Sequence, residues 1–502
     1  MTRAFANFQD LCYFYGMRRI VCLIIAICCA GWLSAGSDDF NCYTIVAGKK
    51  ATADGSVLLA HNEDDGGRLL VNILKVQAQE RRRGEMLTLK EGAVLPQAGS
   101  TAGMLWLEIP GSDFADSYVN EFGVAVTSDA CPSREDKGEL TEGGIGYNLR
   151  RLVAERARTA RDGVRIAGEL LTRFGYNSPG RTYIIADSSE GWLLHAVRGK
   201  RWVARRVPDD EVAVIANRYT ITHVDLGDSH NFQGSPDIVE YAAHRGWYDP
   251  QKDGTFDFAR SYSDPDDYTA MGNVMRQWRG LGLLAKKPPR LEDPLPFSFK
   301  PDRPVRPRDL FRVLRDHYEG TKHDSSDRYR NGSPNSGENR TICTDMTQYA
   351  FVAHLRGWLP AEIASVVWIA GRRPDSNAFS PWYVSLDSVP RGSSREGPEA
   401  AWKSHFLPLP PQALEDPALS FNTYDRLSEE VDRQYRKRIE IVQKVWRNFE
   451  EFLFDDLKDH EKEFAYLLKG NKAIARHLIY NYIHGLEYRK WFMAAELLKE
   501  MK

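Results

Sequence analysis

The sequence Asn41–Asp64, NCYTIVAGKKATADGSVLLAHNED, decides what the rest of the chain can be. It holds two short apolar runs rich in β-branched residues, Tyr43–Gly48 and Val57–His61, which are typical of strands. Between them, Asp54-Gly55 is a dipeptide that favours a tight turn. The pattern therefore predicts a β-hairpin whose second strand returns the chain to the neighbourhood of Cys42.

The predicted hairpin places Asn62, Glu63 and Asp64 beside the Cys42 thiol. If the chain is cut between Asn41 and Cys42, one residue carries both a thiol and a free α-amino group. An α-amino group titrates at about 7.7–8.0, so it can accept the thiol proton, and the thiolate can then attack an amide carbonyl. The alternative from spacing alone is a small buried cysteine on a strand.

The remaining sequence alternates strand-like runs with turns and then becomes helical. Gly146–Phe174 has helical periodicity with a break near Asp162-Gly163, which predicts two helices. Asn422–Lys502 has aromatic and leucine residues at three- and four-residue intervals, and long connections rich in Pro and Asp are expected at 286–309 and 371–412. Further strands are expected at Leu105–Ile109, Gly123–Ser128, Arg181–Ala186, Gly191–Val197, Val212–Ala216, Tyr349–Leu355 and Ala364–Ala370. Strands with segregated helices predict an α+β core with a C-terminal helical extension.

Composition excludes several classes of function. The 502 residues include 67 Lys and Arg against 69 Asp and Glu, a net charge of −2, which gives no electrostatic reason to expect nucleic acid as a partner. We find no Cys/His spacing typical of zinc, no phosphate-binding loop and no Gly-x-Ser-x-Gly motif. The sequence therefore predicts no metal and no cofactor.

The N-terminus has the pattern of an export signal. Met17-Arg18-Arg19 is followed by the apolar run Ile20–Ala30 and then by small residues near Ala35, which predicts a signal peptide over 1–36, with translation starting at Met17 as one reading. Residues 37–41 would form a short propeptide, and the apolar run is shorter than a membrane span. We expect an exported protein, periplasmic or secreted, with no stable membrane span after cleavage.

Several stretches then match a known family in order. They are Asn41–Asp64, Asn120–Cys131, Ala216–Tyr219, Gly254–Ala259, His317–Thr321 and Arg340–Cys343. With these residues the chain resembles the secernin/dipeptidase family of cysteine N-terminal-nucleophile hydrolases, which is related to bile-salt hydrolase and penicillin V acylase. The resemblance implies an αββα four-layer sandwich over 42–415, followed by the helical extension at 416–502.

The resemblance also implies a role for each matching residue. Cys42 would be the nucleophile, Asp64 would hold the α-amino group, Asn217 would donate to the oxyanion, and Arg340 would be an arginine near the nucleophile. Asp129, in the matching stretch Asn120–Cys131, would be a substrate-binding residue, and the hairpin spacing makes Asn62 and Glu63 candidates for the same role. His61 stands where the bile-salt hydrolase branch has an arginine.

These inferences predict an exported cysteine dipeptidase that acts on dipeptides or short peptides through an acyl-enzyme. One alternative is an acylase of the bile-salt hydrolase or penicillin V acylase type, and a second is a non-catalytic binding protein of the same fold. The sequence leaves open a homo-oligomer, and also whether Cys131 and Cys343 form a disulfide.

Overall fold

The computed structural model describes residues 42–336 and 339–501, and all of them belong to one compact unit. The predicted signal peptide and propeptide lie outside the described residues. Within the described ranges, no helix is long and apolar enough to cross a membrane.

The predicted hairpin is confirmed and lies in the middle of a seven-stranded antiparallel sheet, in which Tyr43 pairs with Asn62. Its second strand runs three residues further than expected, so Asn62, Glu63 and Asp64 are strand residues. In spatial order the strands are β16 (Ser298–Phe299), β14 (Val212–Ile215), β1 (Tyr43–Ala47), β2 (Val57–Asp64), β17 (Thr347–Leu355), β18 (Ser365–Gly371) and β19 (Ser380–Tyr383).

A second antiparallel sheet of eight strands faces the first. Its spatial order is β15 (Phe232–Gly234), β13 (Trp202–Arg206), β12 (Gly191–Gly199), β11 (Tyr176–Ala186), β10 (Ala125–Ala130), β9 (Ser117–Asn120), β8 (Met104–Glu108) and β3 (Asn72–Val76). Two small ribbons pair β4 (Gln79–Glu80) with β7 (Ser100–Thr101) and β5 (Met86–Thr88) with β6 (Val94–Pro96).

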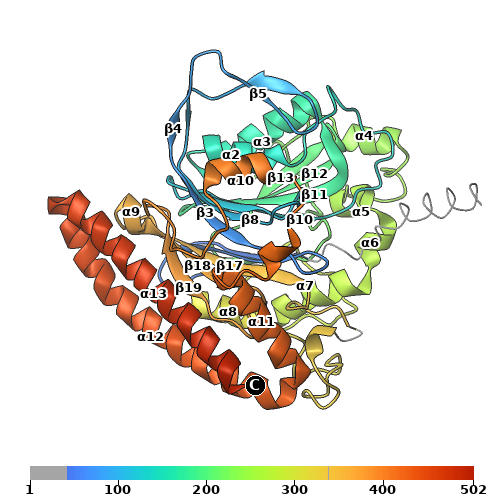
Figure 1. The fold of residues 1–502 in the computed structure, drawn as a ribbon. Coiled ribbons are helices and arrows are strands. Elements are labelled where there is room, and N and C mark those ends of the chain that lie inside the picture. Colours follow the sequence, from blue (N-terminus) through green and yellow to red (C-terminus); the bar gives the residue numbers. More distant parts are fainter. Residues whose placement is uncertain (1–41, 337–338, 502) are drawn as a thin grey trace, which may run out of the picture. The chain divides into compact units, whose positions relative to one another are not determined.

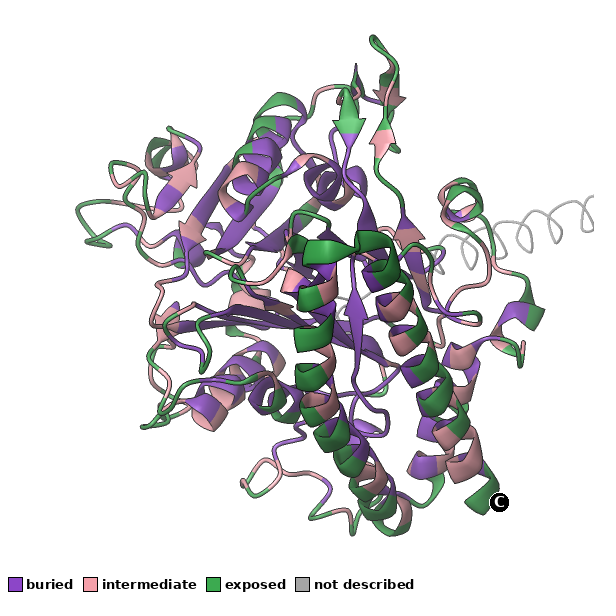
Figure 2. Cartoon of the chain, turned by 90° about the vertical axis from the view of Figure 1, so that its left-hand side faces the viewer, coloured by how far each residue is buried: buried purple, intermediate pink, exposed green. Residues whose placement is uncertain are grey.

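Helices cover the outer face of each sheet. On the second sheet, α2 (Asn148–Arg156) and α3 (Ala160–Phe174) pack against β9–β12, and on the first sheet α7 (Met271–Leu284) and α8 (Pro307–Leu314) pack against β14, β2 and β17 (Figure 1). Every residue of β2 is buried because the strand lies between a helix layer and the other sheet, and Figure 2 shows both sheets as the buried interior. The expected αββα four-layer sandwich is confirmed.

The predicted helix break is wrong in position. The chain leaves α2 after Arg156 and starts α3 at Ala160, where the Thr159 side chain accepts a hydrogen bond from the Asp162 backbone N–H. Asp162 and Gly163 therefore form the first turn of α3. A Cβ at Gly163 would come within 2.9 Å of the Ile185 side chain, so this glycine permits close packing on the sheet and does not interrupt the helix.

The two long connections contain short elements that periodicity did not reveal. Residues 286–309 include β16 and the start of α8, and residues 371–412 include β19 and α10 (Pro398–Ser404). The other short helices are α4 (Ile238–His244), α5 (Phe258–Tyr262), α6 (Pro265–Thr269), α9 (Ala361–Ala364) and the 3-10 turns Pro334–Ser336 and Pro411–Leu414. Two- to eight-residue elements are too short for an amphipathic pattern to separate them from a turn.

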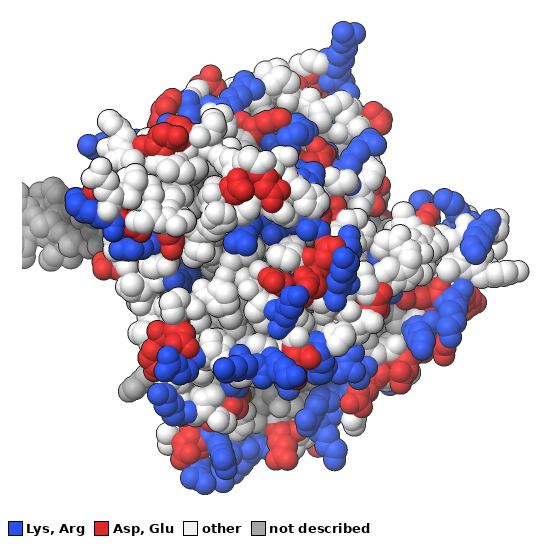
Figure 3. Space-filling view, turned by 180° about the vertical axis from the view of Figure 1, so that it is seen from behind, with Lys and Arg blue, Asp and Glu red and all other residues white. Residues whose placement is uncertain are grey.

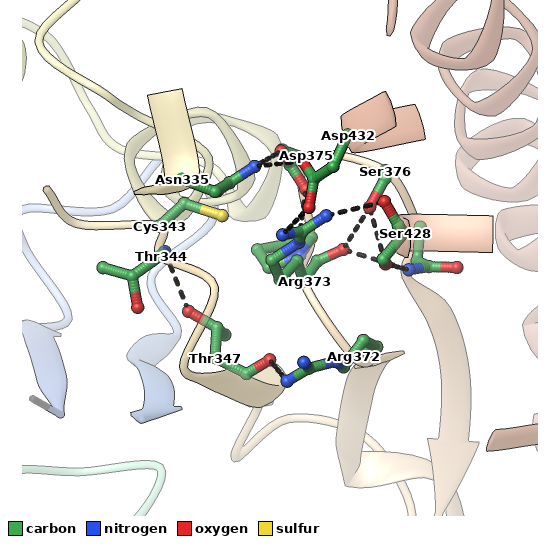
Figure 4. A network of polar contacts seen from close by, with 12 residues as sticks. Asn335, Cys343, Thr344, Thr347, Arg372, Arg373, Asp375, Ser376, Ser428 and Asp432 are labelled. Atoms are coloured by element: carbon green, nitrogen blue, oxygen red, sulfur yellow. Dashed lines mark hydrogen bonds and ion pairs between the residues drawn. The ribbon is translucent and has the colours of Figure 1, made fainter. Parts of the chain in front are cut away.

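Three helices close the chain: α11 (Ser420–Arg433), α12 (Tyr435–Gly470) and α13 (Lys472–Glu500). They pack on β18 and β19, and their outer faces are exposed (Figures 1 and 2). The residues after β18 anchor α11, because Arg373 Nη1 lies 2.6 Å from Asp432 Oδ2 and Arg373 Nη2 donates to the Ser428 carbonyl at 2.9 Å (Figure 4). The proposed domain limit at 415/416 stays a prediction.

Charged side chains of both signs are mixed on the molecular face shown in Figure 3. Acidic and basic groups alternate there over short distances, and neither sign covers the face. This distribution agrees with the nearly balanced composition of the sequence.

Candidate active site

Cys42 lies directly before β1, with 1% of its surface exposed. Its thiol donates a hydrogen bond to Glu63 Oε1, with Sγ at 3.1 Å, and Sγ is 3.9 Å from the Asp64 carbonyl oxygen. Its own carbonyl accepts a hydrogen bond from Arg276 Nη1 at 3.2 Å. The hairpin thus brings together Cys42, Glu63 and Asp64, as the sequence predicted from the turn.

Residues of β2 alternate between two environments because successive strand side chains point to opposite faces. His61 and Glu63 point into the space between the sheets, where His61 lies beside Asp129 of β10. Asn62 points toward the helix layer, and its Nδ2 donates to the Leu314 and Ile342 carbonyls at 3.0 and 2.9 Å. Both N–H bonds of Asn62 are therefore already used, and its side chain does not join the group around the thiol.

A chain of three hydrogen bonds leads to the sulfur. Thr44 Oγ1 is 2.8 Å from His61 Nδ1, His61 Nε2 is 2.9 Å from Glu63 Oε2, and Glu63 Oε1 accepts from Cys42. Burial lowers the pKa of His61 to about 4, so the ring is neutral near pH 7. A neutral ring donates at one nitrogen and accepts at the other, so when Glu63 is ionised, Nε2–H donates to Glu63 and Thr44 donates to Nδ1.

Four buried carboxyl groups surround the thiol: Glu63, Asp64, Asp65 and Asp129. Burial raises the pKa of each, to about 8 for Asp64 and to about 6 for Asp129. The side chains of Thr347 and Thr44 lower the pKa of Asp64 and of Asp129, respectively, against the effect of burial. No well-aligned hydrogen bond reaches the four oxygens of these two carboxyl groups in the part of the chain that the structure describes. Unpaired buried carboxyl groups of this kind are costly, and they are characteristic of sites that bind charged groups.

Arginines partly offset these acids. Arg150 and Arg181 lower the pKa of Glu63 against the effect of burial, and they converge on one hydroxyl, with Arg150 Nη1 at 2.9 Å and Arg181 Nη1 at 3.2 Å from Ser128 Oγ. Sequence reasoning missed both arginines, because α2 and β11 are far from the hairpin in sequence.

Burial, and secondly the Glu63 charge, raise the pKa of the Cys42 thiol well above its ordinary value. The thiol is therefore protonated near pH 7. A nucleophilic reaction at Cys42 needs a base to remove this proton.

Asn217 follows β14 directly and has a φ of 55°, a left-handed conformation that asparagine tolerates better than most residues. Its Nδ2 donates to the Ala130 carbonyl at 2.9 Å, and its Oδ1 accepts from Arg276 Nη2 at 2.8 Å. One N–H of the Asn217 amide remains for another acceptor. Arg276 thus joins Asn217 to the Cys42 carbonyl.

Arg340 lies in the same group. Its Nη1 is 3.0 Å from Asn273 Oδ1, and its Nη2 is 3.4 Å from Asn217 Oδ1. Both Arg276 and Arg340 lower the pKa of Asp64 against the effect of burial. Cys42, Asp64, Asn217 and Arg340, four residues predicted from sequence, are therefore brought together, with Arg276 as the unpredicted link.

A second cluster resembles the first in composition. Among the described residues, two groups combine a cysteine, a histidine and a carboxylate closely enough to hold a metal ion: the Cys42 cluster (Cys42, His61, Glu63) and the Cys343 cluster (His317, Cys343, Asp375). Cys42, Cys131 and Cys343 are all free thiols, so Cys131 and Cys343 are not paired.

Both nitrogens of the His317 ring in the Cys343 cluster are engaged by other side chains. His317 Nδ1 is 3.0 Å from Glu319 Oε1, and His317 Nε2 is 3.0 Å from Asn335 Oδ1, so both ring nitrogens serve as donors. Although burial opposes it, the Glu319 charge raises the pKa of His317, and a protonated imidazole has no lone pair to offer. The cluster instead joins the α11 network around Arg373 (Figure 4).

The sequence profile described as "Peptidase family C69" matches residues 41–409. The chain belongs to peptidase family C69, a family of cysteine peptidases. Curated relatives include a "Probable dipeptidase" of Salmonella dublin, 27% identical over 371 residues, which cover 70% of this chain and 83% of that protein. A "Probable dipeptidase B" of Lactococcus lactis is 25% identical over 459 residues, which cover 87% of this chain and 92% of that protein.

Two solved structures have some similarity to this chain. Penicillin V acylase from Agrobacterium tumefaciens is 13% identical and has a TM-score of 0.34, and the match covers 71% of this chain and 89% of the acylase chain. A mutant of conjugated bile acid hydrolase from Clostridium perfringens is also 13% identical, covers 70% and 98%, and has a TM-score of 0.33.

Proposed function

We propose that this chain is an exported dipeptidase that hydrolyses dipeptides through Cys42 as an N-terminal nucleophile. Membership of a peptidase family and the names of the curated relatives support the reaction class. The observation that carries the proposal is the position of Cys42, whose thiol contacts Glu63 and whose carbonyl binds Arg276 in one buried group.

Removal of residues 1–41 would turn the Cys42 nitrogen from a peptide nitrogen into an amine. The thiolate attacks the scissile carbonyl carbon, and the Asn217 N–H donates to the oxygen that becomes negative. A donor of this kind stabilises the transition state by about 2.7–4 kcal/mol. An acyl-enzyme forms on Sγ, the first amine product leaves, and water releases the acid.

The charges of the site favour a dipeptide over an uncharged acyl group. A dipeptide carries an ammonium group close to its scissile bond, and the unpaired carboxyl oxygens of Asp64 and Asp129 can accept from that group. Arg276 and Arg340 favour the charged form of Asp64, but burial holds its pKa at about 8, so a bound ammonium group would add the missing stabilisation of the carboxylate. The same carboxylates would repel a carboxylate at the acyl end and leave an apolar acyl chain in contact with charged groups.

A direct test compares substrates on the purified protein that starts at Cys42. We expect hydrolysis of unblocked dipeptides and little hydrolysis of the same dipeptides with an acetylated amino group, penicillin V or conjugated bile salts. Equal rates on blocked and free dipeptides would contradict the assignment of the carboxylates. Activity confined to penicillin V or bile salts would favour an acylase instead.

Export is tested by locating the protein after cell fractionation. We expect the form starting at Cys42 in the periplasm or the medium and the full chain in the cytoplasm. Full activity of a cytoplasmic form that still carries residues 37–41 would contradict both export and maturation.

A further inference from the structure

The nearest hydrogen-bond acceptor to the Cys42 thiol is the carboxylate of Glu63, at 3.1 Å. The other acceptor in reach is the Asp64 carbonyl oxygen at 3.9 Å, which cannot take up a proton at neutral pH. The α-amino group that maturation would create is therefore not the only base beside the sulfur. Glu63 touches the reacting atom already in the described state.

The position of Glu63 is fixed from its other side. His61 Nε2 lies 2.9 Å from Glu63 Oε2, and Thr44 Oγ1 lies 2.8 Å from the opposite ring nitrogen, so the ring cannot rotate without breaking two hydrogen bonds. The Tyr349 hydroxyl lies 3.4 Å from the same carboxylate oxygen. The free edge of the carboxylate, Oε1, is thereby aimed at the thiol.

We propose that Glu63 is a catalytic residue that accepts the proton of the Cys42 thiol, and that His61 is the residue that positions Glu63. In this scheme the α-amino group gives a proton to the leaving amine. The inference rests on the proposed dipeptidase function and assigns its proton transfers to two separate groups. It also gives a reason for two polar residues, His61 and Glu63, on a strand face that otherwise packs in a sheet interface.

The transfers balance over one turnover. The S–H bond of Cys42 breaks, Glu63 Oε1 gains the proton, and Sγ bonds to the scissile carbon. The C–N bond breaks as the α-ammonium group gives a proton to the departing amine. The resulting α-amine takes a proton from water, the hydroxide attacks the thioester carbon, and Sγ leaves as thiolate and recovers its proton from Glu63.

The surroundings make Glu63 a stronger base than a carboxylate in water. Burial raises its pKa, and proton transfer to a carboxylate is easier when its pKa approaches that of the thiol. The His61 N–H, Arg150 and Arg181 favour the charged form, which keeps a fraction of Glu63 ionised. The titratable and charged groups facing Glu63 from the elements around it are Cys42, His61, Asp64, Asp65, Asp116, Asp129, Arg150, Arg181 and Tyr349.

The fold contains a matched control. Glu108 of β8 is also a buried strand glutamate bound to a histidine, with Oε1 at 2.9 Å from His405 Nδ1, and no cysteine lies in that pair. Substitution of Glu108 therefore measures the structural cost of losing a buried Glu–His pair. Any additional loss of activity in the Glu63 variants is then due to the contact between Glu63 and the Cys42 thiol.

The test uses the protein starting at Cys42 and measures kcat/KM for a dipeptide against pH. Glu63→Gln should lower kcat/KM by about 100-fold, the scale of general base catalysis, and remove the rise of kcat/KM with pH through the Glu63 pKa. Glu63→Ala should recover about tenfold when formate is added, because formate can occupy the space of the lost carboxylate. Glu108→Gln and Glu108→Ala should keep the wild-type pH profile and show no response to formate.

His61→Ala tests the positioning role. Loss of the Nε2–H donor should raise the pKa of Glu63, so the rise of kcat/KM should move to higher pH while KM stays near the wild-type value. A lower kcat with an unmoved pH profile would overturn this part of the proposal.

Wild-type kcat/KM and pH profile in Glu63→Gln, or a failure of formate to restore Glu63→Ala, would overturn the role of Glu63. Either result leaves the dipeptidase assignment standing if the wild-type protein hydrolyses dipeptides. A wild-type protein starting at Cys42 that does not hydrolyse them contradicts the proposed function itself.

Discussion

The Cys42 cluster and the Cys343 cluster have the same residue types and opposite electrostatics. At Cys343 the Glu319 charge raises the pKa of the histidine, and both ring nitrogens lie within hydrogen-bond distance of protein acceptors. Asp375 Oδ2 accepts from Asn335 and Tyr435, and Asp375 Oδ1, which has no hydrogen bond among the described residues, lies 3.7 Å from Arg373 Nε. At Cys42 the histidine is neutral, and nearby carboxyl oxygens of Asp64 and Asp129 have no well-aligned hydrogen bond among the described residues.

This difference separates a structural cluster from a candidate active site. A buried carboxylate whose pKa is lowered by neighbouring cations, as Asp375 is by Arg373 and His317, stabilises the fold. Buried carboxyl groups with a raised pKa beside a nucleophile, as Asp64 and Asp129 are, are available to a substrate. The residue types alone do not distinguish the two.

Substitution of the two cysteines gives the largest expected contrast. Cys42→Ala should abolish dipeptide hydrolysis, because it removes the proposed nucleophile, and Cys42→Ser should retain at most a trace. Cys343→Ala should keep kcat/KM near wild type and lower the thermal midpoint, as a buried side chain is shortened. Loss of kcat in Cys343→Ala with an unchanged midpoint would contradict the comparison.

Substitution of one asparagine in each cluster tests the comparison of the two clusters further. Asn217→Ala should lower kcat by about 10²–10³-fold with a smaller effect on KM, because its N–H is proposed to act on the oxyanion. Asn335→Ala removes a partner of His317 and should cost about 1–3 kcal/mol of unfolding free energy without changing kcat. Both effects can be measured by steady-state kinetics and chemical denaturation of the same preparations.

Substitution of one arginine in each cluster should show the same division between activity and stability, with smaller changes. Arg276→Lys cannot bond to both the Cys42 carbonyl and Asn217, so kcat should fall by about tenfold or more. Arg373→Lys loses its two contacts with Asp432 and Ser428 and should mainly destabilise the docking of α11. Faster proteolysis near α11 in Arg373→Lys, with normal kcat, would support this division.

The smallest expected effect concerns stability and pH. The pKa of Asp64 is raised to about 8 in the folded protein, so the native state binds more protons than the unfolded state between about pH 4 and 8. The contribution of protonated Asp64 to the free energy of unfolding is therefore present at low pH and is lost as the pH rises through 8. Asp64→Asn should therefore raise the free energy of unfolding at pH 8 by about 1–2 kcal/mol, with little change at pH 4.

Asp375→Asn is the counterpart of that variant. The pKa of Asp375 is lowered by Arg373 and His317 despite burial, so its charge is stabilising in the folded state. Removing the charge should destabilise the protein at pH 8. Stabilisation by both asparagine substitutions would contradict the distinction between the two clusters.

The sequence predicted the features that depend on local pattern. The turn at Asp54-Gly55 and the two apolar runs were enough to place Glu63 and Asp64 beside Cys42. The i, i+2 spacing of His61 and Glu63 also places them on one strand face, which is a signal for their pairing that sequence analysis did not use.

The features of the site that the sequence did not predict depend on contacts between segments that are distant in the chain. Arg276 and Asn273 are ordinary polar residues of an amphipathic helix in the sequence, and only the packing of α7 on β14 brings them to Asn217 and Cys42. The break between α2 and α3 was misplaced because Gly163 was interpreted as a helix breaker, although close packing against Ile185 requires it there.

The central claim is that the thiol and the liberated α-amino group of Cys42 act together. It is tested most directly by comparing dipeptide hydrolysis by two purified forms of equal folding, one starting at Cys42 and one retaining Asn41, each verified by intact mass. We predict kcat/KM only for the form starting at Cys42. Equal kcat/KM for the form that retains Asn41 would contradict the account.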